Sequence, residues 1–407
     1  MNISASVLSS VNLIAFGFGV WDGETLATCR ACGRHPTCAT PATTCHHGDA
    51  QQADLVEVTD LNTRSTPLDE LTITVVVDNE TDNLSSIDAG IPQLPEVVSL
   101  LRRIPPTRRH DGHDCIPVFD HLCVACHGLS VLLTGLVGNE HHTVLFDVGP
   151  YGDVWVDNAE RLGIDISTIE KVFLSHWHWD HSGGLPVVID AIAKARRTAG
   201  LDGTVMVDLH PDRPDQRGIR TPSGTVVMLP EEPTLAALAD AGGTIELHDE
   251  PHLLGEGFFL GSGAIARTTS YEVGLEGHHT FRGDLGEPDP LIMDERFLAA
   301  EVRGRGVTVL SACSHAGIVN ACLGARSHYP ELDIDLVLGG FHLAGALMEQ
   351  RIDATATDLF EVVRPRIVAP GHCTGWRAKA ALADRFAPGR YAPSVVGTSF
   401  FLTAPAD

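Results

Sequence analysis

The chain has 407 residues, of which 43% are hydrophobic and 20% are charged, and its formal net charge is −25. This is enough apolar sequence for a large core, in one large domain or two smaller ones. Such acidity argues against nucleic acid and against a membrane as the main partner, but it leaves a small-molecule substrate, phosphate-bearing ones included, because a bound metal sets the local field.

The first part of the chain, residues 1–67, is rich in small and polar residues and has neither a helical nor a strand period. We predict a poorly structured, Cys-containing leader there, followed by a folded domain over 68–407. The alternative is a structural zinc site, although a single CxxC is a weak signal. Its ligands would be Cys29, Cys32 and one or more of Cys38, Cys45 and His46.

The same region bears on location. Residues 3–20 are fairly apolar, but no Lys or Arg precedes them and Ser, Asn and Gly interrupt them. They resemble neither a signal peptide nor a transmembrane helix. We therefore expect a cytoplasmic protein, and the sequence leaves a homo-oligomer open.

The folded domain is predicted to begin with the β-branched run 71–77, a buried strand that ends at Asp78-Asn79. Two further strands are expected over 127–133 and 144–149, the latter with Asp147 at its end. A helix is predicted over 153–164.

The most informative stretch follows. Apolar residues 172–175 read as the end of a buried strand, and His176, His178, Asp180 and His181 come within the next six positions. Imidazole nitrogens and a carboxylate suit zinc, manganese or iron(II). Since His176 and His178 are two apart, one pair of side chains can serve one metal and the Asp180–His181 pair a second. Four polar residues in a surface loop would be the plain alternative, but the spacing is far more specific.

The rest of the chain repeats this pattern of strand, tight turn with a His, and helix. After a helix over about 185–199, residues 203–290 hold short strands among Gly and Pro breaks, and we expect substrate-facing loops there. Strands are then predicted over 306–310, 335–338 and 366–369, with helices from about 318 and over 345–362. The turns after these strands carry His315, His342 and His372. We predict His315 and His372 as metal ligands and place His342 in the same pocket, on the substrate side or behind the ligands.

These motifs resemble one family. The His-x-His-x-Asp-His stretch is similar to the metal-binding signature of the metallo-β-lactamase superfamily. The runs SACSHAGIVN, GGFHL, PGHCTG, HGLS and VVDNET look like its branch named after dihydropterin-ribofuranosylaminobenzene phosphate synthase. The resemblance covers about residues 70–403 and departs from the branch at Cys126, where relatives tend to carry Glu.

The resemblance implies an α/β fold, an αββα sandwich of two mixed sheets flanked by helices, with one or two divalent metals, most simply Zn2+, with Mn2+ or Fe2+ as alternatives. It implies that Asp147 orients the metal loop. The family's bridging carboxylate has no obvious match, and Cys313 stands at about that place.

Three functions follow. The first is a hydrolase of an ester- or phosphate-containing small molecule acting through a metal-bound hydroxide, with Asp180 and His342 as catalytic residues. No Ser nucleophile motif of the G-x-S-x-G type competes with it. The second is a synthase that condenses a dihydropterin pyrophosphate with ribofuranosylaminobenzene phosphate. The third is a non-enzymatic metal-binding or redox-sensing protein that uses the leader.

Overall fold

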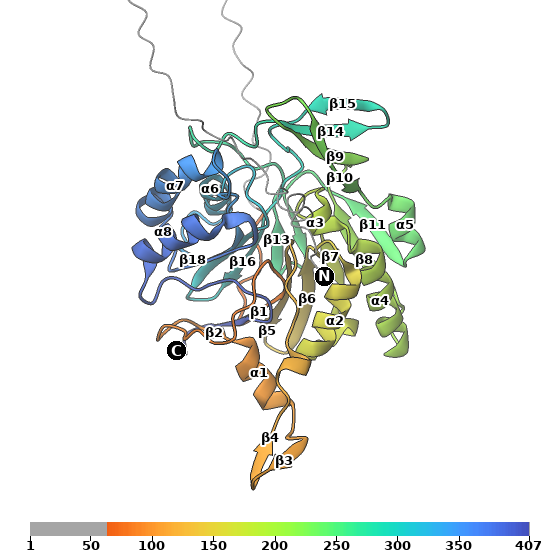
Figure 1. Ribbon diagram of the computed structural model, residues 1–407, viewed down its shortest axis with the longest axis vertical. Coiled ribbons are helices and arrows are strands. Elements are labelled where there is room, and N and C mark those ends of the chain that lie inside the picture. Colours follow the sequence, from red (N-terminus) through yellow and green to blue (C-terminus); the bar gives the residue numbers. More distant parts are fainter. Residues whose placement is uncertain (1–62, 407) are drawn as a thin grey trace, which may run out of the picture.

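Two β-sheets pack face to face in the computed structural model, which describes residues 63–406 (Figure 1). The larger sheet has eight strands in the order β11-β8-β7-β6-β5-β1-β20-β2, and the other has six in the order β12-β13-β16-β17-β18-β19. The strands of the larger sheet are β1 (Glu70–Val77), β2 (Gln93–Leu94), β5 (Ser130–Val137), β6 (Glu140–Phe146), β7 (Lys171–Phe173), β8 (Val205–Leu209), β11 (Gly243–Leu247) and β20 (Ser399–Thr403). The strands of the six-stranded sheet are β12 (His252–Leu254), β13 (Phe259–Gly261), β16 (Leu298–Val302), β17 (Gly306–Ser311), β18 (Ile334–Gly340) and β19 (Ile367–Gly371).

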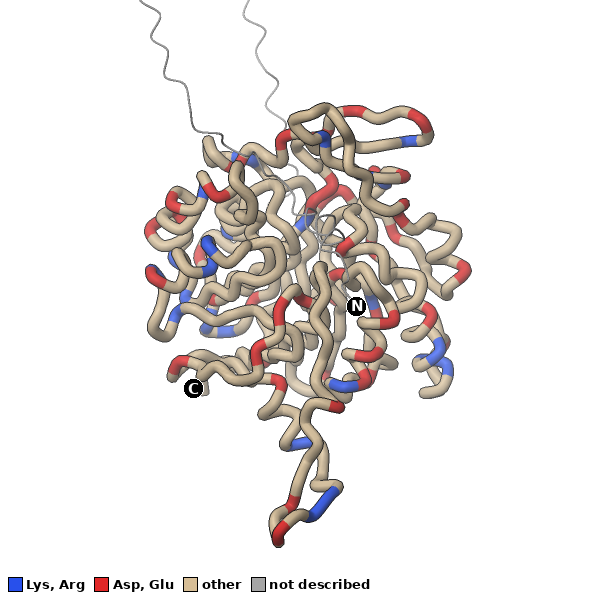
Figure 2. The backbone as a smooth tube through the Cα atoms, in the orientation of Figure 1, with Lys and Arg blue, Asp and Glu red and all other residues tan. Residues whose placement is uncertain are grey.

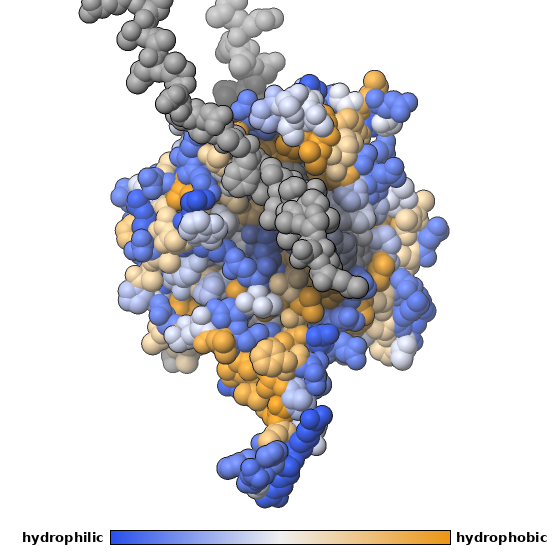
Figure 3. Space-filling view, viewed as in Figure 1, coloured by the Kyte–Doolittle hydropathy of each residue, from blue (hydrophilic) through white to orange (hydrophobic). Residues whose placement is uncertain are grey.

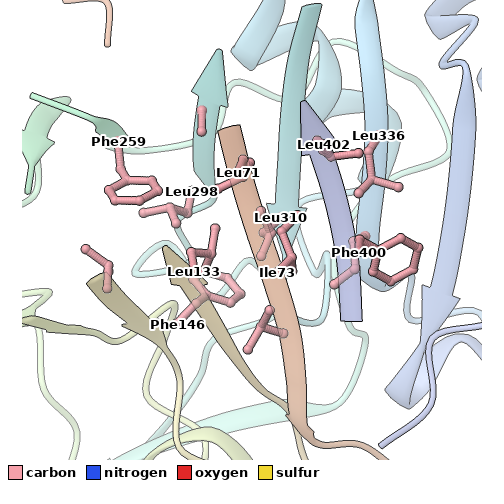
Figure 4. Packing of buried hydrophobic residues seen from close by; sticks show 14 of the residues in the cluster. Leu71, Ile73, Leu133, Phe146, Phe259, Leu298, Leu310, Leu336, Phe400 and Leu402 are labelled. Carbon is pink, nitrogen blue, oxygen red and sulfur yellow. The ribbon is translucent and has the colours of Figure 1, made fainter. Parts of the chain in front are cut away.

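The core between the sheets comes from alternate residues of their facing strands (Figure 4). Ile73 and Leu133 of the larger sheet lie in one buried cluster with Leu310 and Leu336 of the other. Each of these side chains is fully buried. Burying such a side chain contributes about 1.5–3 kcal/mol, so this layer accounts for much of the stability.

Helices cover both outer faces. On the larger sheet lie α2 (Gly152–Leu162) and α4 (Leu185–Thr198), whose apolar side chains form a second core with that sheet. On the other sheet lie α6 (Ile318–His328), α7 (Ile352–Asp358) and α8 (Trp376–Phe386), which enclose a third core (Figure 1). The remaining helices are α1 (Glu96–Arg103), α3 (Trp179–Ser182) and α5 (Leu235–Asp240). The αββα fold predicted from the sequence is confirmed.

The strand arrangement decides where the site can lie. In the larger sheet β6, β7 and β8 are parallel neighbours, and in the other sheet β17, β18 and β19 are parallel neighbours. The turns that follow parallel neighbours meet at one edge of a sheet. The predicted His-bearing turns follow β7, β17, β18 and β19, so they converge at one end of the sandwich.

Residues 203–290 are more regular than expected. Besides β8 and β11–β13 they contain a complete four-stranded sheet, in the order β10-β9-β14-β15. Its strands are β9 (Gln216–Arg220), β10 (Val226–Glu231), β14 (His278–Arg282) and β15 (Leu285–Pro288). This sheet lies over the end of the sandwich near α3 (Figure 1). The short strands predicted here are present, but their pairing into a sheet was not predicted because Gly and Pro turns hide their period. That loops of this region face a substrate stays a prediction.

The surface is acidic, as the net charge of the sequence indicates. Acidic residues outnumber basic ones and are spread over most of the backbone trace (Figure 2). Apolar residues gather at the base of the small hairpin formed by β3 (Arg108–His110) and β4 (His113–Cys115), where Phe119 is 87% exposed (Figure 3). Within residues 63–406, no helix is both long and apolar enough to cross a bilayer.

The segment before β1 packs onto the domain. Ser65 Oγ lies 2.8 Å from the hydroxyl of Tyr329, and the Thr66 amide donates to the Gly257 carbonyl at 2.8 Å. Arg64 pairs with Glu301 at 2.7 Å. The boundary between leader and domain at residue 67 stays a prediction, but these contacts favour a start near residue 63. The zinc site predicted in the leader lies outside the described residues.

A chain starting at residue 63 is therefore expected to fold, and one starting at Leu68 to be less stable. Each lost hydrogen bond costs about 0.5–1.5 kcal/mol, so we expect a difference of about 1–3 kcal/mol in the free energy of unfolding. Urea denaturation of the two chains measures it, with metal content as the control for an intact centre. An insoluble or metal-free chain from residue 63 would instead make the leader part of the domain.

Candidate metal centre

The central motif bridges a strand and a short helix. β7 ends at Phe173, and His176 and His178 follow in a buried segment just before α3, which carries Asp180 and His181. The backbone of Trp177, between the two His, is held from both sides: its amide donates to Asp294 at 2.7 Å and its carbonyl accepts from Arg217 at 2.8 Å. The motif is thus fixed by side chains from the middle of the chain.

The first donor set consists of three imidazole nitrogens. His178 Nδ1 lies 3.1 Å from His176 Nε2 and 3.2 Å from His315 Nε2. The structure therefore brings His315, on the turn after β17, against the motif, as the sequence predicted. His178 Nε2 points the other way and lies 2.9 Å from Nε2 of His278 on β14.

Hydrogen bonds determine which of these nitrogens carry protons. Ser175 Oγ donates to Asp147 at 2.7 Å, so it accepts from His176 Nδ1, 2.8 Å away, and leaves His176 Nε2 bare. His278 Nδ1 lies 2.7 Å from the carbonyl of Asp289, so its Nε2 is bare and accepts from His178 Nε2. His178 therefore carries its proton on Nε2, and its Nδ1 is unprotonated as well. Bare nitrogens facing one another at about 3 Å repel unless a cation lies between them.

The second donor set contains one carboxylate and two imidazoles. Asp180 Oδ2 lies 3.6 Å from His181 Nε2 and 3.3 Å from His372 Nε2. His181 Nδ1 faces the Asp147 carboxylate at 2.8 Å, and His372 Nδ1 faces Asn79 Oδ1 at 2.9 Å. In its neutral form each ring therefore holds its proton on Nδ1 and turns an unprotonated Nε2 toward Asp180.

Cys313 belongs to both sets. Its thiol lies 3.2 Å from His181 Nε2, and it is within ligand range of both the His176–His315 pair and the group of Asp180, His181 and His372. It also lies 3.5 Å from the Cys373 thiol. A Cβ on Gly340 would come 2.7 Å from Cys373 Sγ, so only glycine allows the β18 turn to approach this closely.

His342 lies where the sequence placed it, in the same pocket. Its ring is 4.4 Å from the ring of His315, and with Cys313 and Cys373 it forms a third group of adjacent donors. Its Nδ1 is buried without a hydrogen-bond partner among the described residues. Its catalytic role stays a prediction.

Burial sets the protonation of the site. It lowers the pKa values of His176, His178 and His315 well below the ordinary value, so these rings are neutral, as metal ligands must be. Burial would raise the pKa of Asp180, but in the absence of a bound ion protonated His181 and the neighbouring His127 and His372 side chains hold it well below its usual range. Asp180 is thus a carboxylate.

Together these residues fit two divalent ions. Neutral imidazoles, one carboxylate and a thiol are the donors that zinc and iron(II) bind, and each set supplies at least three of them. The buried Nε2 of His372 has no hydrogen-bond partner among residues 63–406, as expected of a ligand atom. Asp147, Ser314, His342 and His372 all have positive φ values, between 42° and 61°, so the backbone is strained around this site.

Asp147 forms hydrogen bonds that support the metal centre. It accepts from the Ser175 amide and hydroxyl, both at 2.7 Å, and from His181 Nδ1. This contact pattern is the orienting role that the family resemblance implied.

Asp147→Ala is therefore expected to weaken metal affinity by about 10–100-fold, as losses of such supporting carboxylates do. Competition with a fluorescent zinc chelator measures the affinity. The matched control is Asp165→Ala, which removes a carboxylate that also accepts a backbone amide, that of Ser167, at 3.1 Å, but touches no donor. Equal losses in both variants would mean that Asp147 acts only on stability.

Several residues of the site were not predicted. His278 comes from β14, in the region expected to be loops, and its sequence surroundings gave no signal. Cys373 is adjacent to His372 and could have been found by the same argument as Cys313. Glu295 accepts the amides of His315 and Ala316 at 2.7 and 2.6 Å, and burial raises its pKa to about 7. His127 extends from the HGLS run to within 3.4 Å of Asp180.

The chain is similar in sequence to two named proteins. The chain is 28% identical over 265 residues to the 7,8-dihydropterin-6-methyl-4-(beta-D-ribofuranosyl)-aminobenzene-5'-phosphate synthase of Methanocaldococcus jannaschii, covering 64% of this chain and 85% of the relative. It is 34% identical over 140 residues to the lactamase-like protein vrtG of Penicillium aethiopicum, covering 34% of this chain and 38% of that one.

Among solved structures, Tm1679, a metal-dependent hydrolase of the beta-lactamase superfamily, matches with a TM-score of 0.57 at 22% identity, covering 82% of this chain and 99% of Tm1679. This match supports the fold. The family model of the metallo-beta-lactamase superfamily matches residues 125–342, more than half of the chain, including the central motif and His315. The chain therefore belongs to the metallo-beta-lactamase superfamily.

Proposed function

We propose that the protein is a metal-dependent hydrolase of a small molecule that carries an ester or phosphate group. The observation that carries the proposal is the pair of donor sets that share Cys313. When bound, two divalent ions would polarise the attacked carbonyl or phosphoryl oxygen and lower the pKa of water. A thiol among the donors favours zinc or iron(II) over manganese.

The residues of the chain would complete this chemistry. Asp180, a carboxylate beside both His181 and His372, can hold an ion and accept a proton. His342 lies beside His315 and has an unpartnered nitrogen, so it can contact a substrate or its leaving group. The buried walls exclude bulk water, which strengthens every charge interaction in the site.

A cavity beside the centre offers room for the substrate. Its volume is about 600 Å³, within the range of small-molecule sites, and it borders the metal centre at His278. Leu347, Met348 and Val273 form much of its apolar wall, and Arg351 lies at its polar side. An apolar body with one charged group fits such a lining.

Arg351 points to an anionic substrate. Its guanidinium donates to the Gly274 carbonyl at 3.0 Å, and no carboxylate of residues 63–406 lies within ion-pair distance of it. Burial lowers its pKa, against the opposing effect of the Glu272 carboxylate, and a bound anion would stabilise the charge further. The exposed Glu276 also lines the cavity.

The test is turnover by zinc- or iron-loaded protein on 4-nitrophenyl phosphate, bis(4-nitrophenyl) phosphate and an uncharged aryl lactone. We expect hydrolysis that is lost with His178→Ala, together with metal. Pyrophosphate release that requires both a dihydropterin pyrophosphate and the aminobenzene riboside would instead favour the synthase, the activity named for the M. jannaschii relative. Metal binding without any turnover would favour a non-enzymatic role.

Substitutions at Arg351 test the preference for an anionic substrate directly. Arg351→Ala is expected to raise KM for an anionic substrate about 10–100-fold with little change in kcat, and Arg351→Lys should recover part of the loss. KM for the uncharged lactone should not change. An equal effect on both substrates would remove the anion from the proposal and leave the hydrolase.

A further inference from the structure

A second group of donors lies outside the metal centre, between the two sheets. Asp208 lies on β8 of the larger sheet, His248 directly follows β11, and His252 begins β12 of the six-stranded sheet. The three donor atoms are within 4.8 Å of one another, and the group shares no residue with the donor sets described above.

The geometry converges on one oxygen. His252 Nε2 lies 2.7 Å and His248 Nδ1 lies 3.0 Å from Asp208 Oδ2, and the two rings stack with centroids 3.9 Å apart. The other carboxylate oxygen, Oδ1, accepts from Arg296 at 2.8 Å. One oxygen is thus occupied, and the other is left facing two imidazoles.

The tautomer of His252 makes this arrangement unfavourable without a cation. Its Nδ1 lies 3.0 Å from the carbonyl of Glu250, which can only accept, so the proton is on Nδ1. In a neutral ring Nε2 is then bare, and its lone pair faces a carboxylate oxygen. A metal-ligating His donates its other ring N–H in this way, to a backbone carbonyl, and leaves an unprotonated nitrogen for the ion.

His248 adds a second donor of the same kind. Its Nδ1 is buried and lacks a hydrogen-bond partner among the described residues, although it lies beside Asp208. Burial lowers the pKa of His248, which keeps this ring neutral. Its side chain is 34% exposed, so solvent can reach the group and supply a further ligand.

We propose that Asp208, His248 and His252 form a separate transition-metal site for zinc or a similar divalent ion. Two imidazoles, one carboxylate and water complete a four-coordinate zinc site. The positive charge of Arg296 disfavours a metal ion nearby, but this guanidinium also donates hydrogen bonds to the carbonyls of Leu174 and His248, at 2.6 and 3.1 Å. The ion would join β8 to β12 and so connect the two sheets.

The experiment counts zinc in the full chain. Metal-free protein is saturated with zinc, dialysed, and analysed by inductively coupled plasma mass spectrometry. Relative to the unchanged chain, His248→Ala and His252→Ala are each expected to lose one equivalent. The matched control is His142→Ala, because His142 also lies between carboxylates, at 2.8 and 3.2 Å from Glu170 and Glu140, but belongs to no donor group.

A second measurement covers the case in which an alanine variant folds poorly. Two variants are compared for the rise in Tm that added zinc produces: Cys313→Ala, which is expected to release both ions of the main centre, and Cys313→Ala combined with His252→Gln. We expect a zinc-dependent rise that His252→Gln abolishes. Unchanged zinc content in both His variants, with an unchanged rise in Tm, would overturn the site and leave His252 as an imidazolium paired with Asp208.

Discussion

Cys313→Ala is expected to release both metal ions and to lower kcat/KM by about three orders of magnitude, or about 4 kcal/mol. The reason is that Cys313 lies within ligand range of both donor sets, so its loss affects the two ions together. Elemental analysis after dialysis measures the metal, and turnover of the substrate found above measures the rate.

Cys313→Asp is the informative partner variant, because a carboxylate is the family's usual bridging group. It should retain both ions and much of the activity. When cobalt(II) replaces the native metal, the unchanged chain should show a thiolate-to-cobalt absorption band that Cys313→Asp lacks. Full metal content in Cys313→Ala, or no such band in the unchanged chain, would mean that Cys313 is not a ligand.

His315→Ala and His372→Ala are expected to remove different ions. His315 faces His176 and His178, whereas His372 faces Asp180, so each variant should lose one equivalent and retain the other. The activity of each should fall by at least about 100-fold, since one ion cannot do the work of two.

The double variant separates this model from a simpler one. If the sites are distinct, His315→Ala with His372→Ala should lose both equivalents. Anomalous scattering at the metal edge would show which position empties in each single variant. Ions retained at both positions in His372→Ala would limit the centre to the first motif and His315.

The fold and most of the donors were accessible from the sequence for a common reason. Each strand that leads into a His-bearing turn is a short apolar run, and each turn carries small residues, so the pattern is local. This identified the motif, His315, His342 and His372, which the structure brings together, although their role as ligands stays a prediction.

The other residues of the site are brought together only by contacts between distant parts of the sequence. His278 contacts His178 only because β14 folds over the end of the sandwich, and a His within residues broken by Gly and Pro has no period to mark it. Asp208, His248 and His252 are likewise ordinary residues until two sheets meet. Arg351 could not be singled out from the sequence, because an unpaired charge can be recognised only when its neighbours in space are known.

One pairing has a consequence for synthesis. β20 lies between β1 and β2 and joins the first strand of the domain to the last, with Glu70 opposite Thr403. During synthesis β1 therefore has an unpaired edge until β20 has left the ribosome, and only then can this part of the sheet form. Pairing across so many residues slows folding, and an open edge invites other chains. Nascent chains of this protein are accordingly expected to need a chaperone until β20 emerges.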